Sequence, residues 1–130
     1  HLQGMRGQAI DRAALAALDV HHRAVLLDTG WAAHWGTPAY LQAQPFLSRD
    51  GAEYLRDQGA VLVGIDALNI DDTSDPQRPA HSILLAAGIP IVENLASLAT
   101  LPAEGLRFSA VPMRMEGMGT FPVRAWARLV

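Results

Sequence analysis

Three short apolar runs, separated from one another by helical patterns, constrain the fold of this 130-residue chain more than any other sequence feature. Each run has the length of a buried strand and is too short for a helix. The runs occupy residues 24–27, residues 60–65 and the residues from Ile89 onward. Ser48 is a capping residue for a helix that ends near Gln58. A second helix is predicted over residues 79–87, and Gly88, which follows it, ends the helix. Strands that alternate with helices at this spacing predict βαβ units in a parallel or mixed sheet with right-handed crossovers.

The two ends of the chain carry the remaining predicted elements. An Ala-rich stretch over 11–18 begins with Asp11, which suits the start of a short helix. Residues 107–115 and 121–130 are extended segments joined by a glycine-containing turn, so a C-terminal β-hairpin is predicted. Residues 1–9 are expected to be disordered or left over from an expression vector, because an initial His is not a natural translation start. The predicted fold class is therefore α/β, with a single domain over 10–130.

The composition excludes several classes of function. The chain has a net charge of −3, and no cluster of basic residues offers a footprint for nucleic acid. No apolar run approaches the roughly 20 residues that span a bilayer, so a cytoplasmic location is expected rather than a membrane one. The sequence contains no cysteine, which removes thiolate ligands and thiol nucleophiles. Any metal site must therefore use His, Asp or Glu.

His81 and Glu93 are the strongest candidates for such a site, because they lie at the two ends of a predicted helix-turn-strand unit. His81 lies about 10 Å back along the helix from the turn, at roughly 1.5 Å of rise per residue. Glu93 lies roughly 13 Å along the returning strand, at about 3.3 Å per residue. The two side chains should therefore meet at one edge of the fold. An imidazole beside a carboxylate is half of a divalent-metal site.

Several short motifs also occur along the chain in a recognisable order. They are Thr29-Gly30-Trp31, Phe46-Leu47-Ser48, Val63-Gly64-Ile65-Asp66, His81 with Leu84-Leu85, Glu93-Asn94-Leu95 and Pro122-Val123-Arg124-Ala125. This order resembles the cyclase family, which includes bacterial arylformamidase (kynurenine formamidase) and related metal-dependent amide hydrolases. The resemblance runs from about Ile10 to Val130 and covers the C-terminal half to two thirds of a family member. It implies the later part of a swivelling β/β/α fold.

The resemblance also implies a site that holds a divalent metal, usually zinc, and activates water for attack on a formamide carbonyl. His81 and Glu93 match the two ligands that the later part of that site supplies. The earlier ligands and the catalytic His of such proteins belong to a motif of the form H-x-G-T-H-x-D-x-P-x-H, which this sequence does not contain. The expected cofactor is therefore zinc or another divalent metal, weakly bound, and no catalytic residue is assigned. The predicted function is that of a shortened relative of metal-dependent formamide hydrolases, and its activity as an enzyme stays open.

An aromatic segment over 31–46 favours a different class of function. It shows neither a helical nor a strand period and is predicted to be a long surface loop. His34 opens an H-x-G-T sequence, but Pro38 stands where the second His of the family motif would be, so His34 is interpreted as a loop residue. The predicted contact surface comprises Trp31, His34, Trp35 and Tyr40. The alternative function is thus a non-catalytic binding or oligomerisation module.

A partial domain should expose the apolar face that the rest of the fold would cover, and exposed apolar patches tend to be buried by association. A homo-oligomer is therefore predicted. A further alternative is a partner chain that supplies the missing metal ligands.

The polar segment after residue 65 contains four aspartates, Asp66, Asp71, Asp72 and Asp75. A calcium-binding loop does not fit, because Ser74 falls where an EF-hand requires glycine. The segment is predicted to be a solvated acidic loop.

Overall fold

Three parallel strands form the centre of the first of two units, which comprises residues 1–99; the second comprises residues 100–130. The computed structural model describes residues 1–4 and 7–130. The strands are β2 (Ala24–Leu27), β4 (Leu62–Ile65) and β5 (Ile91–Val92), in the spatial order β2-β4-β5. Val63 of β4 is paired with Val25 on one side and with Ile91 on the other. β4 is the central strand of this sheet, and its Val63 and Ile65 are fully buried.

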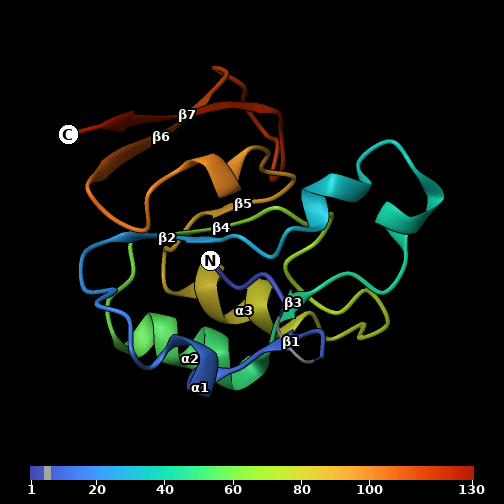
Figure 1. Cartoon of the computed structure of the whole chain (residues 1–130). Helices are drawn as coiled ribbons and strands as arrows, with labels where there is room; N and C mark the ends of the chain where they lie inside the picture. Colours follow the sequence, from blue (N-terminus) through green and yellow to red (C-terminus); the bar gives the residue numbers. More distant parts are fainter. Residues whose placement is uncertain (5–6) are drawn as a thin grey trace. The chain divides into compact units, whose positions relative to one another are not determined.

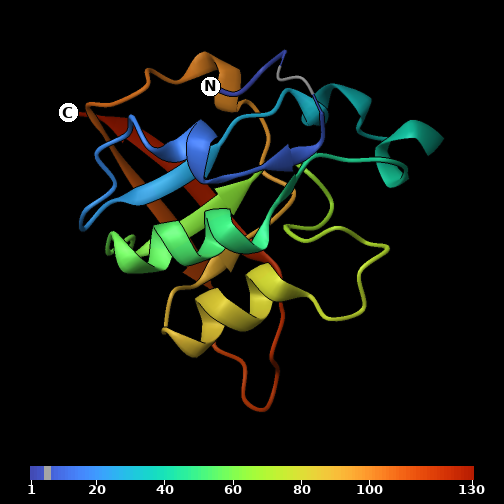
Figure 2. The same ribbon diagram turned by 90° about the horizontal axis from the view of Figure 1, so that it is seen from below.

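The helices of this unit are α1 (Arg12–Leu15), α2 (Arg49–Asp57) and α3 (Pro79–Ala86). Figures 1 and 2 show α2 and α3 side by side on one face of the β2-β4-β5 sheet. The Ser48 hydroxyl accepts the N–H of Gly51 at 3.2 Å, which caps the start of α2 as predicted. Leu55 of α2 and Leu84 of α3 are fully buried, so the core of this unit lies between the helices and the sheet.

A second, two-stranded parallel sheet pairs β1 (Ala9–Ile10) with β3 (Phe46–Leu47). Two 3-10 helices precede β3, namely η1 (Trp31–His34) and η2 (Pro38–Leu41), and a third, η3 (Leu98–Thr100), follows β5. The segment over 31–46, predicted to be a long surface loop, therefore contains two short 3-10 helices. Short 3-10 turns have no apolar period of their own, so a search for helical or strand periods misses them.

The second unit is an antiparallel hairpin of β6 (Leu106–Pro112) and β7 (Val123–Leu129). Arg107 and Arg128 are directly opposite each other in its register. Like charges opposite each other weaken an antiparallel pair, so this hairpin gains no cross-strand ion pair at that position.

The predicted class, mixed α/β with parallel strands and a C-terminal hairpin, is confirmed. The strand over 24–27 has the predicted bounds, whereas the first helix ends at Leu15 rather than at residue 18. Among the described residues, no helix is long and apolar enough to cross a membrane. The expectation for residues 1–9 includes residues 5 and 6, which lie outside the described residues.

Candidate functional site

Asp71 caps the start of α3 from a distance. It lies in the loop between β4 and α3, is 1% exposed, and accepts the N–H groups of Ala80 at 2.6 Å and His81 at 3.1 Å. The residue immediately before the helix is Arg78, which makes no capping hydrogen bond through its side chain. The first N–H groups of a helix have no partner within the helix, so they require an acceptor from elsewhere. The Asp71 carboxylate supplies it.

The same carboxylate fixes the imidazole of His81. Nδ1 of His81 lies 2.6 Å from Oδ2 of Asp71, and the His81 side chain is 18% exposed. A carboxylate only accepts hydrogen bonds, so Nδ1 carries the proton and Nε2 carries the lone pair. A carboxylate behind the imidazole is the usual support of a metal-binding histidine, because it fixes both the tautomer and the ring orientation.

Glu93 directly follows β5, and the structure brings it to His81. Oε1 of Glu93 lies 3.6 Å from Nε2 of His81 and also accepts the N–H of Ile70 at 2.8 Å. The lone pair of His81 and the carboxylate of Glu93 thus face the same small region. These two donor types fit two positions of a divalent cation. Over residues 1–4 and 7–130, no group of three or more His, Asp or Glu side chains is placed to hold a metal, so the role of the pair as ligands stays a prediction.

A cationic side chain also reaches this region. Nη2 of Arg78 lies 2.9 Å from Nε2 of His81. Because guanidinium groups only donate and Nε2 holds the lone pair, Arg78 donates to His81. The His81–Glu93 corner therefore contains an imidazole, two carboxylates and one guanidinium.

The four aspartates after residue 65 do not all belong to a solvated loop. Asp66 and Asp71 are each 1% exposed, so the prediction is wrong for these two. The carboxylate of Asp66 accepts the N–H and the hydroxyl of Thr29, at 3.1 and 2.6 Å, and the N–H of Ala32 at 3.4 Å. Asp66 therefore ties the end of β4 to the segment that follows β2.

Two sequence signals point to these buried carboxylates in retrospect. Asp66 comes directly after a strand of a parallel sheet, and polar residues at the carboxyl ends of such strands commonly form sites. Asp71 is indicated indirectly, because α3 begins after Arg78 without a Ser, Thr, Asp or Asn at the capping position. A helix start that lacks a local cap must find an acceptor elsewhere in the fold.

The four predicted contact residues differ widely in exposure. Trp35 is 66% exposed and His34 is exposed, whereas Trp31 is half-buried and Tyr40 is only 4% exposed. The indole N–H of Trp31 donates to the backbone carbonyl of Tyr40 at 3.1 Å, and the rings of Trp35 and Tyr40 meet edge to face at 5.0 Å. Trp35 and His34 therefore present most of the surface that a partner would contact, and the contact role of the four residues stays a prediction.

Tyr40 connects this aromatic segment to the residue after Glu93. Its hydroxyl donates to Oδ1 of Asn94 at 2.9 Å. Burial raises the pKa of Tyr40, and the nearby carboxylates of Asp66 and Glu93 raise it further, because all three disfavour the tyrosinate. The aromatic segment and the Glu93 turn are thus held together by a phenol that stays neutral.

The raised pKa of Tyr40 predicts a loss of stability at alkaline pH. Above the ordinary tyrosine value of 10.0, the unfolded chain releases the phenolic proton while the folded chain keeps it. The free energy of unfolding should therefore fall as the pH rises from 10.0 toward the raised pKa. In Tyr40→Phe this part of the fall should disappear, at a cost of about 1 kcal/mol at neutral pH from the lost hydrogen bond. Urea unfolding on both sides of pH 10.0 measures this, with Tyr54→Phe as the control that leaves Tyr40 in place. If the free energy of unfolding falls equally steeply above pH 10.0 in Tyr40→Phe and in the parent, Tyr40 is not the source of the loss.

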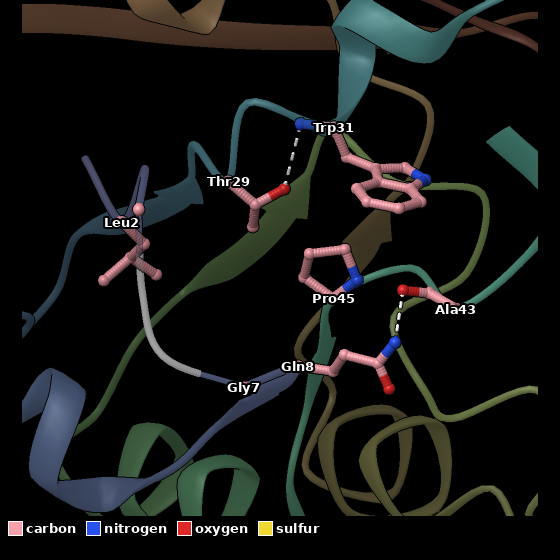
Figure 3. A pocket seen from close by; sticks show the side chains of 8 residues that line it. Leu2, Gly7, Gln8, Thr29, Trp31, Ala43 and Pro45 are labelled. Atoms are coloured by element: carbon pink, nitrogen blue, oxygen red, sulfur yellow. Dashed lines mark hydrogen bonds between the residues drawn. The ribbon is translucent and has the colours of Figure 1, made fainter. Parts of the chain in front are cut away.

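A pocket of about 380 Å³ lies elsewhere in the first unit (Figure 3). It is lined by Leu2, Gly4, Gly7, Gln8, Thr29, Trp31, Ala43 and Pro45. The side-chain amide of Gln8 donates to the carbonyl of Ala43 across one side of it, as Figure 3 shows. His81 and Glu93 do not line this pocket, so it is distinct from the candidate metal corner.

Residues 6–72 match the protein family described as Putative cyclase. A kynurenine formamidase from Geobacillus thermodenitrificans is 30% identical over 129 residues, which are 98% of this chain and 59% of that protein. A kynurenine formamidase from Paracidovorax citrulli is 34% identical over 79 residues, which are 61% of this chain and 36% of that protein. The chain therefore spans less than two thirds of the length of these relatives.

Solved structures show the same fold. A protein described as a predicted metal-dependent hydrolase from Bacillus stearothermophilus has a TM-score of 0.79 and 30% identity, and the match covers 92% of this chain and 57% of that one. Isatin hydrolase A from Ralstonia solanacearum has a TM-score of 0.83, 23% identity and coverage of 92% and 52%, which supports the fold alone.

Proposed function

The chain belongs to the cyclase family, and we propose that it supplies the His81–Glu93 part of a divalent-metal site in an amide hydrolase of that family. The observation that carries the proposal is the pairing of His81 Nε2 with Glu93 Oε1 at 3.6 Å, with the imidazole fixed from behind by Asp71. An imidazole held in this way presents its lone pair in a defined direction. Relatives named as metal-dependent hydrolases and kynurenine formamidases support the class of reaction.

The residues of the corner have separate roles in this proposal. Asp71 keeps the proton of His81 on Nδ1, so that Nε2 remains a donor to a cation. The N–H of Ile70 holds one oxygen of Glu93 in place. A bound divalent ion supplies Lewis-acid activation of an amide carbonyl and of the water that attacks it.

Two protein ligands hold zinc weakly. The described residues place no group of three or more ligands together, so the metal requires ligands in addition to His81 and Glu93. A partner chain is the source we propose. In that arrangement the protein is active as part of a complete site, and the isolated chain binds metal without rapid turnover.

Zinc binding to the isolated chain tests the site. Exposed His21 and His22, whose rings lie 4.0 Å apart, would also attract zinc, so both are first replaced by Ala. In that background, calorimetry should detect one weak zinc site, and His81→Ala and Glu93→Gln should each weaken it roughly tenfold or more. Hydrolysis of an aryl formamide is then measured with zinc present. Zinc binding that is unchanged in His81→Ala would sink the proposal.

The exposure of Trp35 and Leu41 favours a second candidate function, that of a binding or assembly surface. Trp35 is 66% exposed and Leu41, which ends η2, is 61% exposed. Association would bury these two exposed apolar side chains. In this candidate the chain forms a homo-oligomer through the aromatic segment. Light scattering should show a mass above 14.0 kDa that falls toward this value in Trp35→Ser with Leu41→Ser, and a monomer at high concentration argues against it.

A further inference from the structure

We propose that the guanidinium of Arg78 competes with a divalent metal ion for Nε2 of His81, an inference that rests on the proposed role of His81 as a ligand. Arg78 thereby sets how readily the corner takes up metal. The contact is direct, because Nη2 of Arg78 lies 2.9 Å from the nitrogen that would bind the ion.

The competition follows from the tautomer of His81. Nδ1 donates its proton to Asp71 at 2.6 Å, which leaves Nε2 with a single lone pair in the plane of the ring. An N–H of Arg78 already points at that lone pair. A metal ion binds through the same electrons, so the ion and the guanidinium cannot occupy Nε2 together. Metal uptake must therefore displace the Arg78 side chain.

The backbone of Arg78 holds this side chain at the site. Arg78 has φ 46 and ψ 61, a left-handed conformation that is uncommon for residues other than glycine. Its carbonyl accepts the N–H and the hydroxyl of Ser82, at 3.0 and 2.9 Å, and its own N–H donates to the carbonyl of Asp75 at 3.3 Å. These bonds fix where the side chain starts, three residues before His81 in the chain. The guanidinium is thus directed toward the imidazole by a constrained backbone.

Charge acts in the same direction as contact. The carboxylates of Asp71 and Glu93 lie on either side of the His81 ring and attract a cation. Arg78 satisfies part of that attraction, and it repels a second cation even after it has moved aside. Because Arg78 is exposed, solvent and salt screen this repulsion, so the combined effect should be roughly threefold to tenfold in zinc affinity.

Arg78→Gln tests the inference against a matched control. Arg49 is also exposed and donates to Gln77 at 3.3 Å, so Arg49→Gln removes the same charge from the neighbouring surface without touching His81. Both variants are made in the His21→Ala, His22→Ala background and titrated with zinc in a calorimeter. Arg78→Gln should bind zinc roughly threefold to tenfold more tightly than the background, and Arg49→Gln should stay within about twofold of it. Equal tightening in both variants, or weaker binding in Arg78→Gln, overturns the inference.

A second measurement separates this inference from the proposed function. After treatment with a chelator, the ¹⁵N resonances of His81 report the tautomer and the hydrogen bond to Nε2. Arg78→Gln should shift the Nε2 resonance while the Nδ1–H resonance stays in place, and Arg49→Gln should change neither. If the Nε2 resonance does not respond, the contact is absent and the inference fails. If it responds but no variant binds zinc, the proposed metal site fails, and with it the competition.

Discussion

Asp71→Ala should lower the free energy of unfolding by about 3 to 5 kcal/mol, because it removes a buried, charged acceptor and leaves its donors unpaired. The Asp71 carboxylate serves the N–H groups of Ala80 and His81 and the Nδ1–H of His81, and it is 1% exposed. Water cannot easily replace it, since Ala80 is fully buried. Urea unfolding of the variant and the parent measures the change. The expected loss is a large share of the roughly 5 to 15 kcal/mol that stabilises a typical domain.

Asp71→Asn separates the structural role of this residue from its role at the site. One oxygen remains to accept an N–H of the helix, so the fold should survive with a smaller loss of stability. The amide nitrogen is a donor, however, and it cannot face the Nδ1–H of His81. The imidazole should therefore move its proton to Nε2, which should weaken zinc binding roughly tenfold or more, as His81→Ala does. Asp72→Asn is the control, because within the described residues the carboxylate of Asp72 accepts its hydrogen bonds from the N–H and the hydroxyl of Ser74. A change in stability below about 0.5 kcal/mol in Asp71→Ala would place Asp71 among ordinary surface residues and contradict this account.

The elements that could be predicted from the sequence are those whose signal is local. The run over 24–27 is apolar at every position and is followed by polar residues. It forms β2 with the predicted bounds. The start of α2 could also be predicted, because the capping hydroxyl of Ser48 directly precedes the helix in the chain. The pairing of β1 with β3 has no such signal. Each strand has only two residues, and Ile10 is paired with Leu47 because the rest of the fold places the two strands side by side.

The candidate site divides in the same way. The proximity of His81 and Glu93 could be predicted from the rise per residue of a helix and a strand, because one helix, one turn and one strand separate them. Asp71 and Arg78 could not be assigned roles from their spacing. Asp71 is in a polar segment, and its burial follows from how the loop folds back over the start of α3. The backbone of Arg78 adopts a left-handed conformation that directs its side chain toward His81. This conformation could not be predicted from the sequence, because it is uncommon for residues other than glycine.

Gly51 shows how closely the parts of the first unit approach one another. It lies in the first turn of α2, and a Cβ atom there would be 2.5 Å from the backbone oxygen of Ile10 and 2.9 Å from Cδ1 of Leu47. The Ile10 oxygen cannot simply retreat. It accepts the N–H and the hydroxyl of Ser48, at 3.0 and 3.1 Å, and these bonds connect β1 to the start of α2. Any side chain at residue 51 must therefore separate the helix from β1.

Gly51→Ala should consequently lower the free energy of unfolding by about 2 to 3 kcal/mol, although alanine favours a helix over glycine by about 0.5 to 1 kcal/mol. The overlap outweighs the propensity because a backbone oxygen, rather than the end of a flexible side chain, stands in the way. Gly119→Ala is the matched control, since a Cβ atom at Gly119 meets nothing within 4 Å. Chemical unfolding should show a clear loss for the first variant and almost none for the second. A gain in stability for Gly51→Ala would mean that α2 and β1 lie farther apart in solution, so that helix propensity decides the outcome.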